Sequence, residues 1–162
     1  LEGLETGAEA YLEKPFNKEE LFVRLRKLVE LRKELRKRYS SLVLPEPSHE
    51  KQLRLEDGFM YKLHTAFQDN LEVEDFGIAQ LCNIMAMSRA QLYRKFKALT
   101  DRTLMDYLIS FRLHQARELL MKSDLNVTQA AYQVGFKNLA HFSTRFREEY
   151  GIKPSEVRHK KT

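Results

Sequence analysis

The stretch NVTQAAYQVGFKNLAHFSTRFREEY, residues 126–150, decides the fold of this chain. On either side of Gly135 its apolar residues recur in steps of three and four, which indicates helices with one buried face; they are Val127, Ala130, Ala131, Val134, Phe142, Phe146 and Tyr150. Asn138 is a good N-cap residue for the second run. Two short helices joined by a tight turn that contains glycine are the sequence form of a helix-turn-helix.

The same pattern occurs about fifty residues upstream, in GIAQLCNIMAMSRAQLYRKFKAL, residues 77–99. With an offset of 50, Ser88 aligns with Asn138, so a good N-cap residue opens the second helix of both copies. Ser88 and Gln91 also have the spacing of a capping box. The first helices of the two pairs align with an offset of 49, so the second copy carries one extra residue in its turn. The sequence therefore predicts a duplicated helix-turn-helix unit.

Composition sets the limits for the rest of the chain. Its 162 residues, 43% of them hydrophobic, suffice for one ordinary domain or for a small domain with an appendage. A formal net charge of +5 and a pI near 9.3 permit an acidic partner without identifying one. The single cysteine, Cys82, excludes an internal disulfide framework and fits a buried apolar role in a reducing compartment. Because the chain opens at Leu1 without an initiator methionine, we expect a fragment of a longer protein.

Neither a membrane span nor a signal peptide is visible in the sequence. No apolar run approaches the roughly 20 residues that a spanning helix needs, and the first residues lack the charged and apolar regions of a signal peptide. We therefore expect a cytoplasmic chain with no membrane contact.

The N-terminal residues have the pattern of a different structural unit. Residues 10–12 are predicted to form a short strand, which Lys14 and Pro15 end. Asn17 then provides an N-cap for a helix predicted over residues 18–39. This helix carries leucines at positions 21, 25, 28, 31 and 35 between lysines and arginines. The pattern leaves two interpretations open: a homodimer helix, or packing on its own domain with a solvated basic face.

The prolines at positions 45 and 47 divide the chain, because they stop any helix and favour an extended linker. The predicted organisation is residues 1–39 as an N-terminal segment, 40–53 as a linker and 54–162 as the main domain. In that domain an amphipathic helix over residues 56–70 is expected to cover the first helix-turn-helix. A long helix over residues 104–122, capped by Thr103, is expected to hold the two units at a fixed separation. The predicted fold class is all-α.

Residues 55–158 resemble the DNA-binding domain of the AraC/XylS family of bacterial transcription regulators. The motifs that carry the resemblance are FRLHQARELL (111–120), VGF (134–136) and GIKPSEVR (151–158). The resemblance implies two helix-turn-helix units joined by the long helix. It also implies double-stranded DNA and RNA polymerase as partners.

A second resemblance concerns GAEAYLEKPFNKEEL, residues 7–21, which is similar to the end of a response-regulator receiver domain. In that family the lysine matched by Lys14 contacts the phosphorylated site, and the proline matched by Pro15 is usually cis. Residues 1–39 would then be a receiver remnant with a signalling helix. The chain would be the output end of a two-component response regulator or of a hybrid sensor kinase.

The first recognition helix is predicted to read most of the DNA sequence. Such a helix buries one face and offers the other to the bases, with its N-terminal part nearest to them. The residues expected to face outward are Arg89, Ala90, Tyr93, Arg94 and Lys97. Arg94 is the predicted base contact, because arginine can bond both acceptors on guanine. Arg89 and Lys97 are predicted to reach phosphates.

The outward face of the second recognition helix is almost uncharged, and it consists of Leu139, Ala140, Ser143, Thr144 and Arg147. Thr144 stands where many family members carry arginine, and Arg145 follows one place later. Strong base-specific bonding by this helix is therefore not expected. Lys137, Asn138 and Arg147 are expected to hold the DNA backbone.

Four other positions carry expectations. Asp101 stands where the family often has glycine, which should slightly weaken the turn after the first unit. His141 matches a position that is often aromatic, so partial packing is expected, with a DNA contact as the alternative. Arg112 and Arg117 are expected to be structural ion-pair partners, with a phosphate contact as the alternative for Arg112.

An enzyme and an interaction module are the two alternatives to DNA binding. An enzyme has little support, since the five histidines lack metal-ligand spacing and no phosphate loop or nucleophile motif is present. No catalytic residue, metal or cofactor is therefore expected. The other class is an interaction module that acts through the basic helix over residues 18–39.

Overall fold

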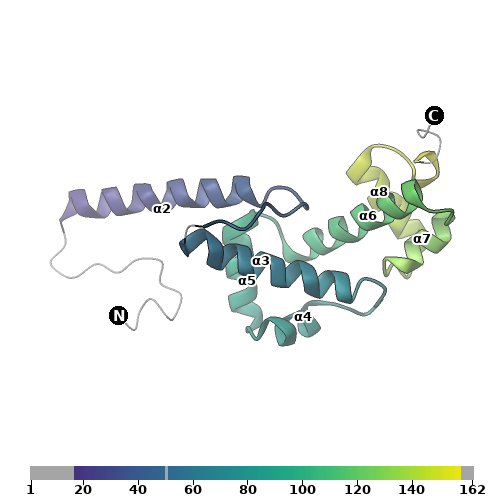
Figure 1. The fold of residues 1–162 in the computed structure, drawn as a ribbon, viewed down its shortest axis with the longest axis horizontal. Helices are drawn as coiled ribbons and strands as arrows, with labels where there is room; N and C mark the ends of the chain where they lie inside the picture. Colours follow the sequence, from purple (N-terminus) through teal and green to yellow (C-terminus); the bar gives the residue numbers. More distant parts are fainter. Residues whose placement is uncertain (1–16, 50, 158–162) are drawn as a thin grey trace.

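Figure 1 shows the protein as a computed structural model, which describes residues 17–49 and 51–157. Every regular element in these ranges is helical, which confirms the all-α prediction. The elements are α2 (Lys18–Arg38), α3 (Lys51–Asp69), α4 (Ile78–Met85), α5 (Arg89–Thr100), α6 (Leu104–Lys122), α7 (Val127–Gln133), α8 (Leu139–Tyr150) and the short 3-10 helix η1 (Pro154–Glu156). The strand predicted at residues 10–12, together with Lys14 and Pro15, lies outside the described residues.

The long helix α6 joins two helical units, as predicted (Figure 1). Its first half packs into a core with α3, α4 and α5, and its second half packs into a core with α7, α8 and η1. Leu108 and Phe111 belong to the first core, and Leu113 and Ala116 to the second. Leu71, in the loop after α3, packs against both cores. One continuous helix therefore carries the two units side by side.

Both units use the predicted capping chemistry. The side chain of Ser88 accepts a hydrogen bond from the backbone of Gln91, and Asn138 accepts one from His141, so each recognition helix begins at a capped residue. Ala86 in the first turn and Gly135 in the second both have positive φ, at an offset of 49. The recognition helices begin at an offset of 50. The extra residue of the second copy therefore lies between the positive-φ residue of the turn and the start of the recognition helix.

Asp101 and Gly151 end the recognition helices of the two units in the same left-handed conformation, with φ of 58° and 69°. Aspartate is strained in this conformation, whereas glycine is not. Asp101 has a second role that the sequence did not indicate: its carboxylate lies 3.3 Å from the guanidinium of Arg36 on α2.

The last turns of α2 are part of the first unit. Leu35 and Tyr39 are buried in its core, and α2 packs against α5. Its first half projects away from the domain (Figure 1), and Phe22, Leu25 and Val29 are exposed there. Among the described residues, the helix thus packs on its own domain at one end and carries an exposed apolar face at the other. The predicted division of the chain at residues 40–53 stays a prediction; α3 begins inside that range, at Lys51.

A buried carboxylate anchors α2 and the linker to α3. Asp57 is 2% exposed and accepts hydrogen bonds from Arg38 (Nε at 2.9 Å and Nη2 at 2.8 Å), from the Tyr39 hydroxyl at 2.7 Å and from the Ser48 backbone at 2.7 Å. Burial alone would raise the pKa of Asp57, but the bonds from Arg38, Ser48 and Tyr39 lower it below its ordinary value. Arg38 was expected on a solvated helix face, and that expectation is wrong because its guanidinium is bound here.

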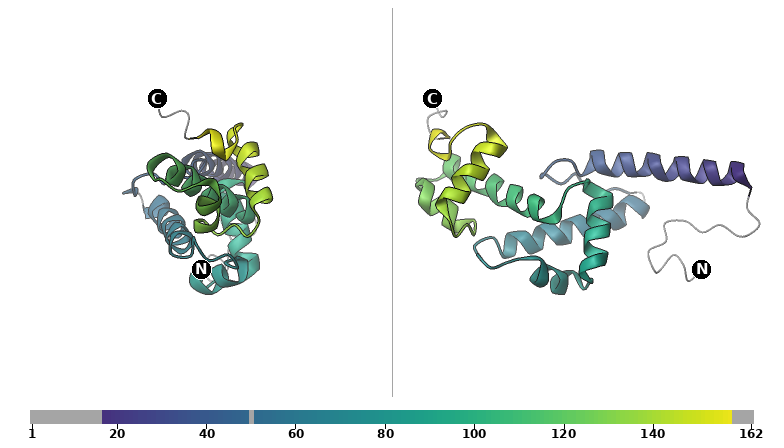
Figure 2. Two further views of the ribbon diagram at one scale, coloured as in Figure 1. Left: turned by 90° about the vertical axis from the view of Figure 1, so that its right-hand side faces the viewer. Right: turned by 180° about the vertical axis from the view of Figure 1, so that it is seen from behind.

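The two recognition helices, α5 and α8, lie on the same side of the molecule. Seen from behind in Figure 2 (right), both stand in front of α3 and α6 and run in similar directions. Leu92, Phe96 and Leu99 on α5 and Phe142 and Phe146 on α8 are buried, as the periodicity predicted, whereas Tyr150 is half-buried and Thr100 is buried without having been predicted. None of the described helices is long and apolar enough to cross a bilayer.

Candidate nucleic-acid interface

The first recognition helix offers three cations on its exposed face. Arg89, Arg94 and Lys97 are all exposed, Ala90 is exposed beside them, and Tyr93 is half-buried. The guanidinium of Arg89 lies 5.5 Å from the centre of the Tyr93 ring, which directs it along the helix surface. Within the described ranges, neither Arg94 nor Lys97 forms an ion pair. These two side chains are therefore available to an external anion.

The second recognition helix presents the nearly uncharged face that the sequence predicted. Leu139, Ala140, Thr144 and Arg147 are exposed and Ser143 is half-buried. Arg145 does not replace the arginine that Thr144 lacks. Its guanidinium turns toward α6 and lies 3.4 Å from Asp106 and 3.1 Å from Glu148. Arg147 is thus the cation left on this face.

Two residues before α8 are already engaged within the protein. The ammonium group of Lys137 pairs with Asp75, which lies in the loop between α3 and α4. The hydrogen bond that Lys137 donates to the Asp75 carboxylate raises the pKa of Lys137 above its ordinary value. Asn138 uses its side-chain oxygen to cap α8, so only its amide group is free to donate. DNA contacts by these residues stay predictions.

Arg112 connects the two units through backbone carbonyls. This α6 side chain is 9% exposed; its Nη2 donates to the Val73 carbonyl at 2.8 Å, and its Nη1 donates to the Gly135 carbonyl at 3.2 Å. Its Nε has no hydrogen-bond partner among the described residues, and burial lowers the pKa of the guanidinium. Both expectations for Arg112 are therefore wrong: within residues 17–49 and 51–157 it pairs with no carboxylate, and it is too buried to reach a phosphate.

Gly135 lies where only glycine fits. A Cβ at this position would be 2.6 Å from the carbonyl oxygen of Leu71 and 2.9 Å from Cζ of Arg112, and φ is +79°. The VGF turn of the second unit is thus pressed against the α3–α4 loop of the first. We refer to Leu71, Val73, Arg112 and Gly135 as the inter-unit joint.

Two other expectations have structural outcomes. The guanidinium of Arg117 lies 5.1 Å from the centre of the Tyr150 ring, so its contact is a cation–π interaction and not the predicted ion pair. The His141 ring lies 5.8 Å from the Phe136 ring, which agrees with partial packing, although His141 remains exposed.

Sequence reasoning missed Asp57, although a signal for it was present. Asp57 falls at helical spacing between Leu53 and Met60, which are both buried on the inner stripe of α3. A carboxylate on an apolar stripe requires hydrogen-bonding partners. The partners of Arg112 had no such signal, because a backbone carbonyl is present at every position.

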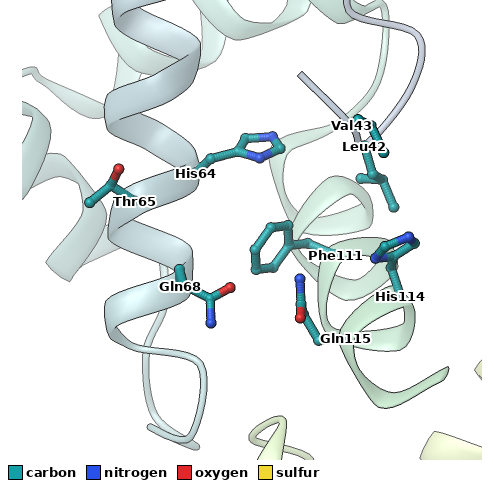
Figure 3. A pocket seen from close by; sticks show the side chains of 8 residues that line it. All are labelled: Leu42, Val43, His64, Thr65, Gln68, Phe111, His114 and Gln115. Carbon is teal, nitrogen blue, oxygen red and sulfur yellow. The ribbon is translucent and has the colours of Figure 1, made fainter. Parts of the chain in front are cut away.

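A shallow pocket of about 360 Å³ lies between the linker, α3 and α6 (Figure 3). Its lining residues are Leu42, Val43, His64, Thr65, Gln68, Phe111, His114 and Gln115, and none of them lies on α5 or α8. Among the described residues no group of three or more His, Cys, Asp and Glu side chains is placed to hold a metal ion. The pocket is therefore separate from the face that carries the recognition helices.

His64 makes the stability of the first unit depend on pH. Burial lowers its pKa to about 4, and its Nε2 shares a hydrogen bond of 2.7 Å with the Tyr107 hydroxyl. The unfolded chain takes up this proton below about pH 6.5, but the folded chain resists until about pH 4. The free energy of unfolding should therefore fall across this window by on the order of 2–3 kcal/mol.

Urea unfolding at pH 7 and pH 5 measures this effect. His64→Gln keeps a polar side chain that does not titrate. The free energy of unfolding of this variant should therefore fall less between pH 7 and pH 5 than that of wild type. His114→Gln, on the other side of the same pocket, is the control. An identical fall in wild type and His64→Gln would assign the pH dependence to other groups.

Comparisons with known proteins identify this architecture. Residues 81–160 match a family model described as a helix-turn-helix domain. The chain is 31% identical over 159 residues to histidine kinase P4 of Formosa agariphila, and this match covers 98% of the chain but 12% of the kinase. It is 45% identical over 73 residues to the HTH-type transcriptional activator RhaS of Escherichia fergusonii, which covers 45% of the chain and 26% of the activator.

Solved structures agree with these matches. The DNA-binding domain of the transcriptional factor AdpA, in complex with a target DNA, is 29% identical, with a TM-score of 0.57 over 62% of this chain and 89% of that one. An AraC-type transcriptional regulator from Chromobacterium violaceum is 27% identical, with a TM-score of 0.59 over 64% and 91% of the two chains. Residues 81–160 therefore belong to the AraC/XylS-type helix-turn-helix domains, the DNA-binding domains of transcription regulators.

Proposed function

We propose that this chain binds double-stranded DNA sequence-specifically, with α5 and α8 entering successive major grooves on one face of the duplex. The observation that carries the proposal is the exposed face of α5 with its cations Arg89, Arg94 and Lys97, on a helix that lies on the same side of the molecule as α8 (Figure 2). Two recognition elements on one side meet equivalent grooves when they are about one helical turn, roughly 34 Å, apart. The solved complex of AdpA with DNA supports this reading for a similar domain.

The two helices would divide the work unequally. Arg94 has no ion-pair partner among the described side chains and is placed to bond guanine in a bidentate manner. On the outward face of α8 the residues other than Arg147 are uncharged, and Arg145 is held by Asp106 and Glu148. We infer that α5 reads most of the sequence and that α8, with Lys137 and Asn138 before it, contributes backbone and apolar contacts.

Arg94→Ala tests the assignment of base reading. Loss of a bidentate contact should cost about 1–3 kcal/mol on the selected site and relax the preference at one base pair. The matched control is Lys95→Ala, which removes the neighbouring cation from the side of α5 that faces α3, where Lys95 lies 2.9 Å from Glu56. Competition gel shifts with selected and random duplexes measure both variants. Equal weakening on the two duplexes would reassign Arg94 to a phosphate.

The general proposal is tested by selection of bound sequences from a random DNA pool, followed by titration at several salt concentrations. A specific site should emerge, and its affinity should fall steeply as salt rises, since phosphate contacts release counterions. If no sequence is enriched and no duplex is shifted at low salt, the chain is an interaction module and not a DNA reader.

The surrounding protein belongs to the same proposal. The match to a histidine kinase along nearly the whole chain supports an output domain of a two-component system, with residues 1–39 as the receiver remnant and signalling helix. The similarity to a transcriptional activator supports contact with RNA polymerase. The proposed binding to DNA supports a cytoplasmic location for the chain.

Self-association through α2 is a further part of the proposal. The projecting half of α2 exposes Phe22 (65%), Leu25 (47%) and Val29 (52%) at helical spacing, a pattern suited to packing against a second helix. Sedimentation of the wild-type chain, alone and with a DNA duplex, measures the mass of the species. A monomer under both conditions would contradict a homodimer helix.

A further inference from the structure

We propose that Arg112 is a positioning residue that fixes how far apart along DNA the two half-sites must be. This inference rests on the proposed function, since it concerns how the two recognition helices are held relative to each other. It assigns the fixed spacing to the inter-unit joint as well as to the length of α6.

A connecting helix alone does not set the orientation of the two units. α6 contributes its first half to one core and its second half to the other, so its length of 19 residues fixes their distance. Contacts between the units away from the axis of α6 add to the packing of α6 itself in resisting a twist of one unit against the other, because they act at a larger distance from that axis. The α3–α4 loop and the VGF turn supply such contacts.

Arg112 makes these contacts stiff. One planar guanidinium donates to a carbonyl of the first unit, Val73, and to a carbonyl of the second, Gly135, at 2.8 and 3.2 Å. The group is buried, so water cannot replace either bond without cost. Because the guanidinium fork is rigid, the two carbonyls are held at a set distance and angle.

The glycine completes the joint from the other side. Without a side chain, Gly135 lets its backbone reach the Leu71 carbonyl, and a methyl group there would be only 2.6 Å from that oxygen. Among the described residues, weaker links outside the joint also connect the units. They include the exposed ion pair of Lys137 with Asp75, and the bonds of Ser110 with Arg102 and Glu149.

The spacing of DNA half-sites is sensitive to this orientation. One base pair added between two half-sites moves the second by about 3.4 Å and turns it by roughly 35° around the duplex. A protein whose two units are locked cannot follow this rotation without strain or DNA distortion. A protein whose units twist about α6 can follow part of it.

The experiment uses the site that wild-type protein selects from a random pool, with one base pair inserted or removed between its two parts. Wild type should lose on the order of tenfold in affinity for each altered duplex. Arg112→Met retains an apolar stem but has no hydrogen-bond donors. The affinity of this variant for the altered duplexes should therefore be only about threefold or less below its affinity for the original site. Arg112→Lys is the second variant, because a single ammonium group cannot span both carbonyls, and it should relax the spacing in the same way.

Arg117→Met is the matched control, since Arg117 lies on the same helix but stacks on Tyr150 within the second unit. It should keep the wild-type spacing profile. The proposal is overturned if wild type binds the altered duplexes within about twofold of the original, a result that needs no variant to fold. It is also overturned if a folded Arg112 variant keeps the wild-type profile. Failure of wild type to select any site would instead refute the proposed function.

Discussion

Gly135→Ala is expected to destabilise the protein by about 3–5 kcal/mol, since it combines backbone strain with a clash inside a buried joint. The left-handed conformation, with φ of +79°, costs a residue with a side chain roughly 1–2 kcal/mol. The added methyl would also lie 2.6 Å from the Leu71 carbonyl oxygen and 2.9 Å from the Arg112 guanidinium. Neither neighbour moves freely, because one is backbone and the other is bound to two carbonyls. Urea unfolding followed by circular dichroism measures the loss.

Substitutions at two other glycines distinguish the cost of backbone strain from the cost of the steric clash. Gly151→Ala meets the same strain, at φ of +69°, but nothing lies within 4 Å of its Cβ, so it should cost only about 1–2 kcal/mol. Gly58→Ala lies inside α3 with open space around it and should stabilise by roughly 0.5–1 kcal/mol, since alanine is the better helix former. If Gly135→Ala and Gly151→Ala cost the same, the close approach at the joint contributes nothing.

Asp57→Asn should cost about 3–5 kcal/mol, as expected when one partner of a buried ion pair is removed. Each oxygen of Asp57 accepts two hydrogen bonds, from Arg38 and Tyr39 on one and from Arg38 and Ser48 on the other. An asparagine amide has the same shape but turns a donor toward donors. The guanidinium of Arg38 then loses its counter-charge. Urea unfolding gives the loss, and hydrogen exchange in the last turns of α2 should rise with it.

Glu56→Gln is the matched control for this variant. It is the adjacent residue on α3, and its carboxylate lies 2.9 Å from Lys95 in a partly exposed ion pair. Such pairs contribute about 0–1 kcal/mol, so this change should leave the exchange of α2 unaltered. A small loss for Asp57→Asn, comparable with that of Glu56→Gln, would mean that α2 is held by Leu35 and Tyr39 packing alone.

The recognition helices α5 and α8 have some features that local sequence determines and others that only tertiary packing creates. Periodicity alone predicted which residues of α5 and α8 are buried, because side chains three and four apart share one helix face. It also predicted that the outer face of α8 is nearly uncharged. That Arg145 turns toward Asp106 was not predictable, because these residues are 39 positions apart and meet only when α8 packs on α6.

The basic helix α2 shows the same division. Its start at a capped Asn17 and its extent were predicted from local chemistry, and both are confirmed. Its leucine pattern was compatible with a dimer helix and with packing on its own domain. The fold places Leu35 in the core and leaves Phe22 and Val29 exposed, because the linker turns the chain back and brings Asp57 to Arg38.

The sequence by itself determined the two helix-turn-helix units, their caps, the connecting helix and the faces of the recognition helices. Each of these depends on residues a few positions apart, whose spacing is visible in the chain. Only the tertiary structure decided how the units are joined. The partners of Arg112 are the carbonyls of Val73 and Gly135, 39 and 23 residues away. Every residue carries such a carbonyl, so no side-chain pattern marks the two that the fold brings to the guanidinium.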